Sequence, residues 1–87
     1  MNGMSGQPVG IVTDTELRQL LQRCHWIAAS RGQGPPATIF GIGFQVFLDR
    51  LLVAGALRRS THFSGFAVCD HVDRVAVYRD GSVVVLP

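Results

Sequence analysis

The sequence predicts an α+β domain: two principal helices packed on a three-stranded antiparallel sheet with a C-terminal β-hairpin. Apolar residues recur at helical spacing in the N-terminal part of the chain, and beyond Ser60 they recur at every second residue. Asp80-Gly81, a dipeptide typical of hairpin turns, separates two apolar runs. With 87 residues, 47% hydrophobic and 16% charged, the chain suits one folded domain and is too apolar to be disordered.

Residues 1–8 are small and polar, which predicts a flexible N-terminus, and residues 9–87 are predicted to form the single domain. Residues 9–12 are apolar and fit either a short strand or a lid over the core. No basic run followed by an apolar stretch opens the chain, and polar residues interrupt its most apolar segment, 39–57, so we expect no secretory signal and no membrane contact. Two cysteines make no disulfide framework, which favours a reduced, cytoplasmic protein.

The first helix is predicted to run from Asp14 to about Ser30. Thr13 and Glu16 have the spacing of a capping box, in which each side chain binds the other residue's backbone N–H. Gly32 follows as the left-handed residue that ends a helix. The apolar stripe of this helix comprises Leu17, Leu20, Leu21, Cys24, Ile27 and Ala28.

Trp26 falls on the opposite, polar side of that predicted helix. Two interpretations are open: residues 9–12 fold over this side chain, or it is exposed and belongs to a binding surface. Tryptophan is enriched at the centres of protein interfaces, which supports the second interpretation.

A second helix is predicted over residues 44–57, after a Gly- and Pro-rich connector and an ambiguous stretch at 38–43. Its apolar residues surround the axis almost completely, so we expect it to be buried on both sides, between the first helix and the sheet. Arg58 and Arg59 then follow at its C-terminus, where cations stabilise the helix dipole.

The sheet is predicted from residues 63–70, 72–79 and 82–86. A two-residue type I′ turn gives both Asp80 and Gly81 a positive φ and places Tyr78 opposite Val83. One face then carries Val75, Val77, Val84 and Leu86, and the other carries Ala76, Tyr78, Val83 and Val85. Because both faces are apolar, we expect the second to contact another copy or a partner, unless residues 9–12 or 31–43 cover it.

The predicted core combines the inner faces of these elements. It comprises Leu17, Leu20, Leu21, Cys24, Phe47, Leu48, Leu51, Val75, Val77 and Val84.

No catalytic, cofactor-binding or metal-ligating residue is predicted. Cys69, His71 and His62 lack the closely paired spacing that zinc ligands usually have. Cys69 and His71 also supply a nucleophile and a base, but alternation along a strand does not make them converge. Gly32-Gln33-Gly34 has no following lysine, so it is not a phosphate-binding loop. These observations argue against an enzyme.

The order helix, connector, helix, strand and hairpin, with LDRLLVAGALRR at 48–59, resembles the recognition helix and wing of winged-helix domains over residues 14–86. The resemblance implies a short helix at 38–43 and nucleic-acid contacts from Gln45, Arg50, Arg58, Arg59, His62 and Arg79. With a net charge of only +2, the chain lacks the dense basic stripe of a dedicated nucleic-acid binder, and Asp49 would repel phosphates.

The leading hypothesis is a small, non-enzymatic interaction or regulatory module that binds a protein partner as a homodimer. Its interface is predicted to include Trp26, Ala76, Tyr78, Val83 and Val85. The alternative is a winged-helix-like nucleic-acid-binding domain of a transcriptional regulator.

Overall fold

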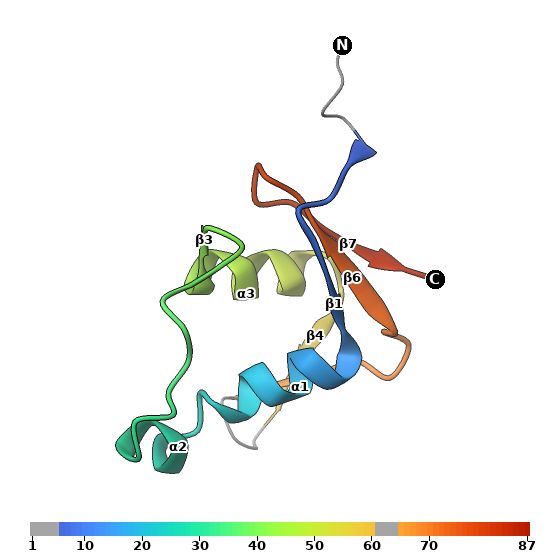
Figure 1. Cartoon of the computed structure of the whole chain (residues 1–87). Coiled ribbons are helices and arrows are strands. Elements are labelled where there is room, and N and C mark those ends of the chain that lie inside the picture. The colour runs from blue at the N-terminus through green and yellow to red at the C-terminus, as the bar shows by residue number, and fades with distance from the viewer. Residues whose placement is uncertain (1–5, 61–64) are drawn as a thin grey trace.

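A computed structural model describes residues 6–60 and 65–87. As predicted, it is an α+β domain, and the described residues form three helices and three antiparallel sheets (Figure 1). The elements are β1 (Gly10–Thr13), α1 (Asp14–Gln22), α2 (Trp26–Ser30), β2 (Thr38–Ile39), β3 (Ile42–Gly43), α3 (Phe44–Val53), β4 (Leu57–Arg59), β5 (Phe66–Val68), β6 (Arg74–Val77) and β7 (Val83–Leu86). Most of the predicted flexible segment 1–8, the start of predicted strand 63–70 and His62 lie outside the described residues. None of the described helices is long and apolar enough to span a bilayer.

The main sheet has the order β1-β6-β7, with both neighbouring pairs antiparallel. Of residues 9–12, open to two interpretations from the sequence, residues 10–12 lie in its first strand, and Val12 lies opposite Val75. The prediction that segment 63–70 belongs to this sheet is wrong. Its described part, β5, pairs with β4, and the Cys69 N–H donates to the Ala56 carbonyl at 2.9 Å, so its backbone is already bonded to the segment after α3.

The β6–β7 hairpin has a loop one residue longer than the predicted two-residue turn. The Tyr78 N–H donates to the Ser82 carbonyl and the Gly81 N–H to the Tyr78 carbonyl, each at 2.9 Å, which leaves residues 79–81 as the loop. This is the geometry of a type I turn followed by a left-handed glycine. Gly81 has φ 94°, as predicted, but a positive φ at Asp80 was wrong, since Phe40 is the only described non-glycine residue with one.

Asp80 stabilises this longer loop with its side chain. Its Oδ1 accepts hydrogen bonds from the Ser82 hydroxyl and from the Ser82 N–H, the latter at 2.9 Å. These bonds, with a weaker contribution from the charge of Arg50, lower the pKa of the Asp80 carboxyl. The stabilisation is therefore present at neutral pH and is lost as pH falls through the lowered pKa.

The extra loop residue changes which side chains of β7 face the core. Val77 lies opposite Val83 and Ala76 opposite Val84, whereas the predicted turn placed each β6 residue opposite the next one along β7. A shift of one residue moves every side chain of one strand to the other face. Val83 and Val85 therefore pack partly against the core, and Val84 lies on the outer face beside Ala76.

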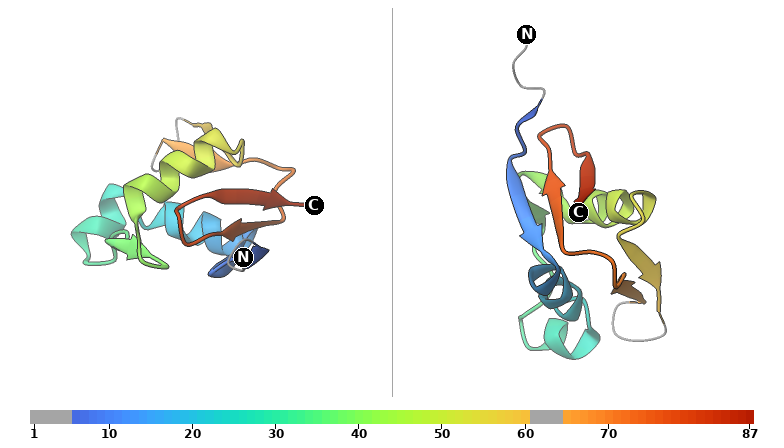
Figure 2. Two further views of the ribbon diagram at one scale, coloured as in Figure 1. Left: turned by 90° about the horizontal axis from the view of Figure 1, so that it is seen from above. Right: turned by 90° about the vertical axis from the view of Figure 1, so that its right-hand side faces the viewer.

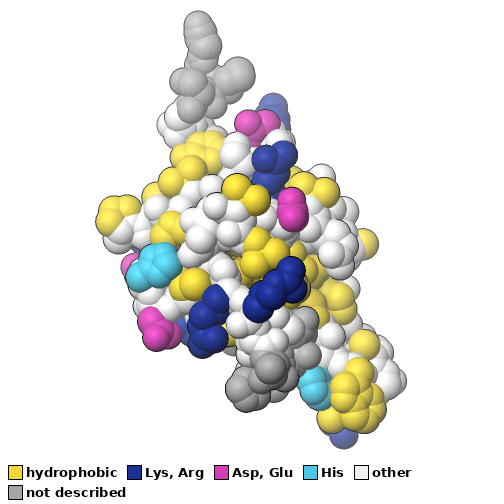
Figure 3. Space-filling view, turned by 180° about the vertical axis from the view of Figure 1, so that it is seen from behind, with side chains coloured by type: hydrophobic (Ala, Val, Ile, Leu, Met, Phe, Trp, Pro, Cys, Tyr) yellow, Lys and Arg dark blue, Asp and Glu magenta, His cyan; other side chains and the backbone are white. Residues whose placement is uncertain are grey.

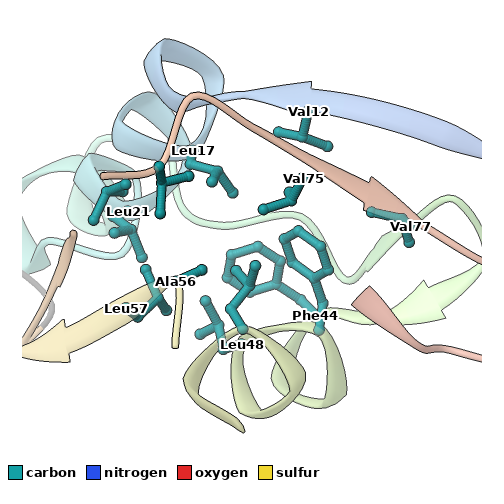
Figure 4. Close-up of a cluster of buried hydrophobic side chains, with 13 residues drawn as sticks. Val12, Leu17, Leu21, Phe44, Leu48, Ala56, Leu57, Val75 and Val77 are labelled. Atoms are coloured by element: carbon teal, nitrogen blue, oxygen red, sulfur yellow. The ribbon is translucent and has the colours of Figure 1, made fainter. Parts of the chain in front are cut away.

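The core lies between the main sheet, α1 and α3, with side chains from β1, α1, α3 and β6 converging in its centre (Figure 4). Burial is confirmed for most of the predicted core: Leu17, Leu21, Phe47, Leu48, Leu51, Val75 and Val77. Leu20 and Cys24 are partly buried at its edge. Val84 was wrongly predicted to be buried: it is 46% exposed because of the register shift.

The predicted first helix is divided into α1 and α2. The capping box is confirmed: the Glu16 N–H donates to Thr13 Oγ1 at 3.2 Å, and the Thr13 N–H donates to Glu16 Oε1 at 3.0 Å. At 23–25 the backbone leaves the helix, because His25 adopts an extended conformation and its Nδ1 accepts from the Ile27 N–H as the N-cap of α2. Gly32, with φ 77°, follows α2 as predicted.

The predicted second helix is shorter than expected, because α3 ends at Val53 and Gly55 follows with φ 78°. Leu57 and the two following arginines form β4, so the expectation that Arg58 and Arg59 stabilise a helix C-terminus is wrong. The expected burial of this helix on both sides is also wrong, since Val53 is 80% exposed.

Residues 38–43 form the β2–β3 hairpin, in which Ile39 pairs with Ile42, so the short helix implied by the winged-helix resemblance is absent here. Phe40 and Gly41 form its turn with φ 51° and 78°. The Phe40 ring lies over Gly10 of β1, where a Cβ would be 2.3 Å from the ring. Gly10 thus permits this hairpin to pack on the main sheet.

Candidate functional site

α2 is a short helix at one end of the molecule, away from the main sheet (Figures 1 and 2). It has no buried residue, and Trp26 at its first position is 72% exposed. Residues 9–12 do not cover this side chain, because they form β1. Ile27 beside it is also exposed, so α2 presents adjacent apolar side chains to solvent. In Figure 3, hydrophobic side chains and a histidine lie together at this end of the molecule.

Hydrogen bonds join the connector at 33–34 both to α2 and to the turn that precedes it. The Arg23 Nε donates to the Gly34 carbonyl at 3.1 Å, and the Gln33 N–H donates to the Ala28 carbonyl at 2.7 Å. The His25 ring lies beside the Trp26 indole, with 5.9 Å between the centroids. The exposed tryptophan therefore sits on a folded segment with bonded ends.

The sheet residues predicted for the interface do not share one face. Ala76 is on the outer face but only 1% exposed, whereas Val83 and Val85 are on the inner side and partly buried. The outer face carries a different apolar row, in which Ile11 and Val84 flank Ala76 on the neighbouring strands and are exposed. The sequence held one signal for this arrangement: Ser82 after Asp80-Gly81 allows the side-chain bonds that favour a longer loop.

A groove of about 900 Å³ lies beside this row, between residues 7–9, which precede β1, and the β6–β7 loop. Tyr78, half-buried, lines it, so this predicted interface residue lies near an accessible surface, whereas Val83 and Val85, predicted to share its face, point inward. The other lining residues are Gln7, Pro8, Val9, Arg79, Asp80, Ser82 and Val84.

A second, smaller cleft of about 260 Å³ lies between α1 and the β4–β5 pair. Arg18 and Arg58 line it together with polar Gln22 and apolar residues of β5. Arg59, exposed on β4, places its guanidinium carbon 5.8 Å from the centroid of the Phe66 ring. Arginine side chains interleave with hydrophobic ones on this rear face, where β4 and β5 lie (Figures 2 and 3).

No family model, curated protein or solved structure matches this chain. Its function is therefore inferred from these surfaces.

The residues predicted for nucleic-acid contact lie on several elements. Gln45 and Arg50 are exposed on α3, Arg79 is in the β6–β7 loop, and Arg58 and Arg59 are on β4. His62 lies outside the described residues. Since 38–43 is a hairpin and the two arginines belong to a strand, the residues do not form the recognition helix and wing that the sequence suggested.

Within residues 6–60 and 65–87, no group of three or more His, Cys, Asp or Glu side chains is placed to hold a metal ion. The Cys24 thiol donates to the Leu20 carbonyl at 3.7 Å, and burial raises its pKa despite the nearby charge of Arg23. A thiol with a raised pKa carries less of the reactive thiolate at neutral pH. This environment fits a packing role for Cys24.

Proposed function

We propose that the chain is a small, non-enzymatic interaction module that binds a protein partner through α2 and acts as a homodimer. The observation that supports partner binding is Trp26, 72% exposed on a helix with no buried residue. Tryptophan is among the residues that carry most of the energy at interfaces. The free cysteines Cys24 and Cys69 fit a reducing, cytoplasmic compartment.

The size and setting of Trp26 favour binding energetically. Covering an aromatic side chain of this size removes roughly 150–250 Å² of surface from water. At about 25 cal/mol per Å² this is worth several kcal/mol before the costs of association. Because the His25 cap at the start of α2 and the Gln33–Ala28 hydrogen bond at its end hold the helix in place, little further conformational entropy is lost when a partner docks on it.

The test is site-specific photocrosslinking in the cells that produce the protein. A photoreactive phenylalanine analogue at position 26 should yield a discrete crosslinked protein, whereas the same analogue at Val53, 80% exposed on α3, should not. Trp26→Ala should abolish co-purification of that protein and change the free energy of unfolding by less than about 0.5 kcal/mol, since the side chain packs against little.

Equal crosslinking at positions 26 and 53, or none at 26, would contradict this proposal. Loss of stability above about 1 kcal/mol in Trp26→Ala would also count against it, because the indole would then have a structural role.

Nucleic-acid binding is a second proposal, favoured by the arginine-lined cleft and by exposed Arg58 and Arg59 on β4. Arginine binds phosphate through its planar guanidinium, and Phe66 beside Arg59 offers an aromatic neighbour for a base. If this is correct, the chain binds oligonucleotides with an affinity that falls steeply with salt.

In this case Arg58→Ala combined with Arg59→Ala should weaken oligonucleotide binding and lower the salt dependence, with the slope falling by about one for each phosphate that the variant no longer binds. Fluorescence anisotropy over a salt series measures both quantities. Arg31→Ala, an exposed arginine at the end of α2, is the matched control and should change neither. Identical binding curves for the double variant and the wild type would remove this alternative.

A further inference from the structure

β7 forms a free edge of the main sheet, since β6 pairs with one side of it and no described strand lies on the other. Tyr78 and Ser82 form a hydrogen-bonded pair at the loop, and such pairs alternate along an antiparallel ladder. Ser82, Val84 and Leu86 therefore direct their backbone groups toward β6. The N–H and C=O groups of Val83 and Val85 point away from the sheet.

The side chains of β7 do not protect this edge from pairing. Natural edge strands commonly carry charged residues, prolines or bulges that prevent another strand from adding. β7 consists of Val83-Val84-Val85-Leu86, has no charged residue, and pairs with β6 without a bulge. Valine is also among the residues that favour extended strands.

We propose that a second copy of this chain pairs with β7 along this edge, antiparallel and about a twofold axis at Val84. In this register, Val83 of each copy exchanges hydrogen bonds with Val85 of the other, so every outward backbone group of both residues is satisfied. The two sheets become one continuous sheet. The inference rests on the homodimer part of the proposed function and identifies the surface that forms it.

Other twofold registers satisfy fewer groups. An axis at Val85 places Val83 opposite Pro87, which has no N–H to donate. An axis at Val83 places Val85 opposite Gly81, whose left-handed φ of 94° takes it out of the strand. The backbone of β7 is thus complementary to itself at Val84.

The outer face supports the same register. Val84 is 46% exposed, and its exposed neighbour across β6 is Ile11 of β1. With the axis at Val84, the two Val84 side chains meet and the apolar row Ile11-Ala76-Val84 continues into the second copy. Contact between the valines removes apolar surface from water in both copies.

Disulfide trapping tests the register directly. Residues at a non-hydrogen-bonded antiparallel position have Cα atoms about 4.5 Å apart, within the range of about 4.4–6.8 Å that a disulfide bridges. Val84→Cys should form a crosslinked dimer under mild oxidation, seen on a non-reducing gel. Val53→Cys, which is more exposed, should remain largely monomeric, and the wild type gives the background from Cys24 and Cys69.

Sedimentation over a concentration series tests the pairing itself. The wild type should dimerise, and Val84→Lys should raise the dimer dissociation constant at least tenfold, because two ammonium groups would meet at the axis. Val53→Lys is the matched control. Trp26→Ala should stay dimeric, so failure of partner binding and failure of the dimer are distinguishable.

A wild type that is monomeric at millimolar concentration would overturn the proposal, as would a dimer in which Val84→Cys crosslinks no better than Val53→Cys. If Val84→Lys is misfolded by circular dichroism, the disulfide result decides. A monomer whose position 84 crosslinks to a different protein would show that another strand, not a second copy, occupies the edge.

Discussion

Phe47→Ala should destabilise the domain by about 3–5 kcal/mol, the range for truncating a fully buried aromatic side chain. Phe47 is 1% exposed and is the largest of the fully buried side chains in the described core. It lies on the inner side of α3, next to Phe44, with 6.2 Å between the ring centroids. A domain of this size has a total stability of only about 5–15 kcal/mol, so this single substitution should remove a large fraction of it.

Urea denaturation followed by circular dichroism measures this loss. Val53→Ala is the matched control: it removes methyl groups from the same helix, but at an exposed position, and should change the free energy of unfolding by less than about 0.5 kcal/mol. A loss below about 1 kcal/mol at Phe47, or equal losses at both positions, would show that α3 does not present this face to the core.

Gly81→Val should have the next largest effect, a loss of about 1–3 kcal/mol. Gly81 has φ 94°, a conformation that β-branched residues strongly resist, and it closes the loop that sets the β6–β7 register. The strain falls on the residue next to the Ser82–Tyr78 hydrogen bond. We therefore expect the loss of stability to be accompanied by weaker protection of the Tyr78 amide in hydrogen exchange.

Gly81→Asn is the control for this variant, because asparagine tolerates left-handed conformations better than valine does. It should recover part of the lost stability and of the amide protection. If valine and asparagine are both neutral, the loop does not depend on a left-handed residue at this position, and the three-residue geometry is wrong.

The elements that the sequence predicted correctly are those governed by local chemistry. Thr13 and Glu16 determine the start of α1 through hydrogen bonds across three residues. Leucines at helical spacing on α1 and aromatic and leucine residues on α3 can bury only one way, so most of the core was predicted. The left-handed glycines at 32 and 81 also follow from neighbouring residues.

The errors arose where distant parts of the chain, or a single residue of loop length, decide the outcome. β1 pairs with β6 across most of the sequence, and no local pattern indicated that residues 9–12, rather than 63–70, would complete the sheet. The break at 23–25 depends on His25 capping α2, while the apolar periodicity continues through it. A hairpin loop of two or three residues differs little in sequence, yet it exchanges the faces of β7.

The residues predicted for the interaction surface show the same division. Trp26 was predicted to be exposed from its place opposite the apolar stripe of one continuous helix. It is exposed for a different reason: it lies on α2, a separate helix that buries no residue, so Ile27 and Ala28 of the predicted stripe are not buried either. The predicted position of Val83 and Val85 on the outer face is wrong because the predicted β6–β7 loop is one residue too short. The exposed row of Ile11 and Val84 could not be predicted from the sequence, because it depends on the pairing of β1 with β6.

That α2 contributes no residue to the core has a consequence for how the chain can diverge. Substitutions at core positions are constrained by folding, but those at Trp26 and Ile27 leave the packing of the core unchanged. If α2 is the binding surface proposed above, descendants of this sequence can exchange one binding preference for another through a few codon changes, with no compensating mutation in the interior. The same property makes the segment 26–30 a place to graft a foreign recognition sequence onto an otherwise unchanged scaffold.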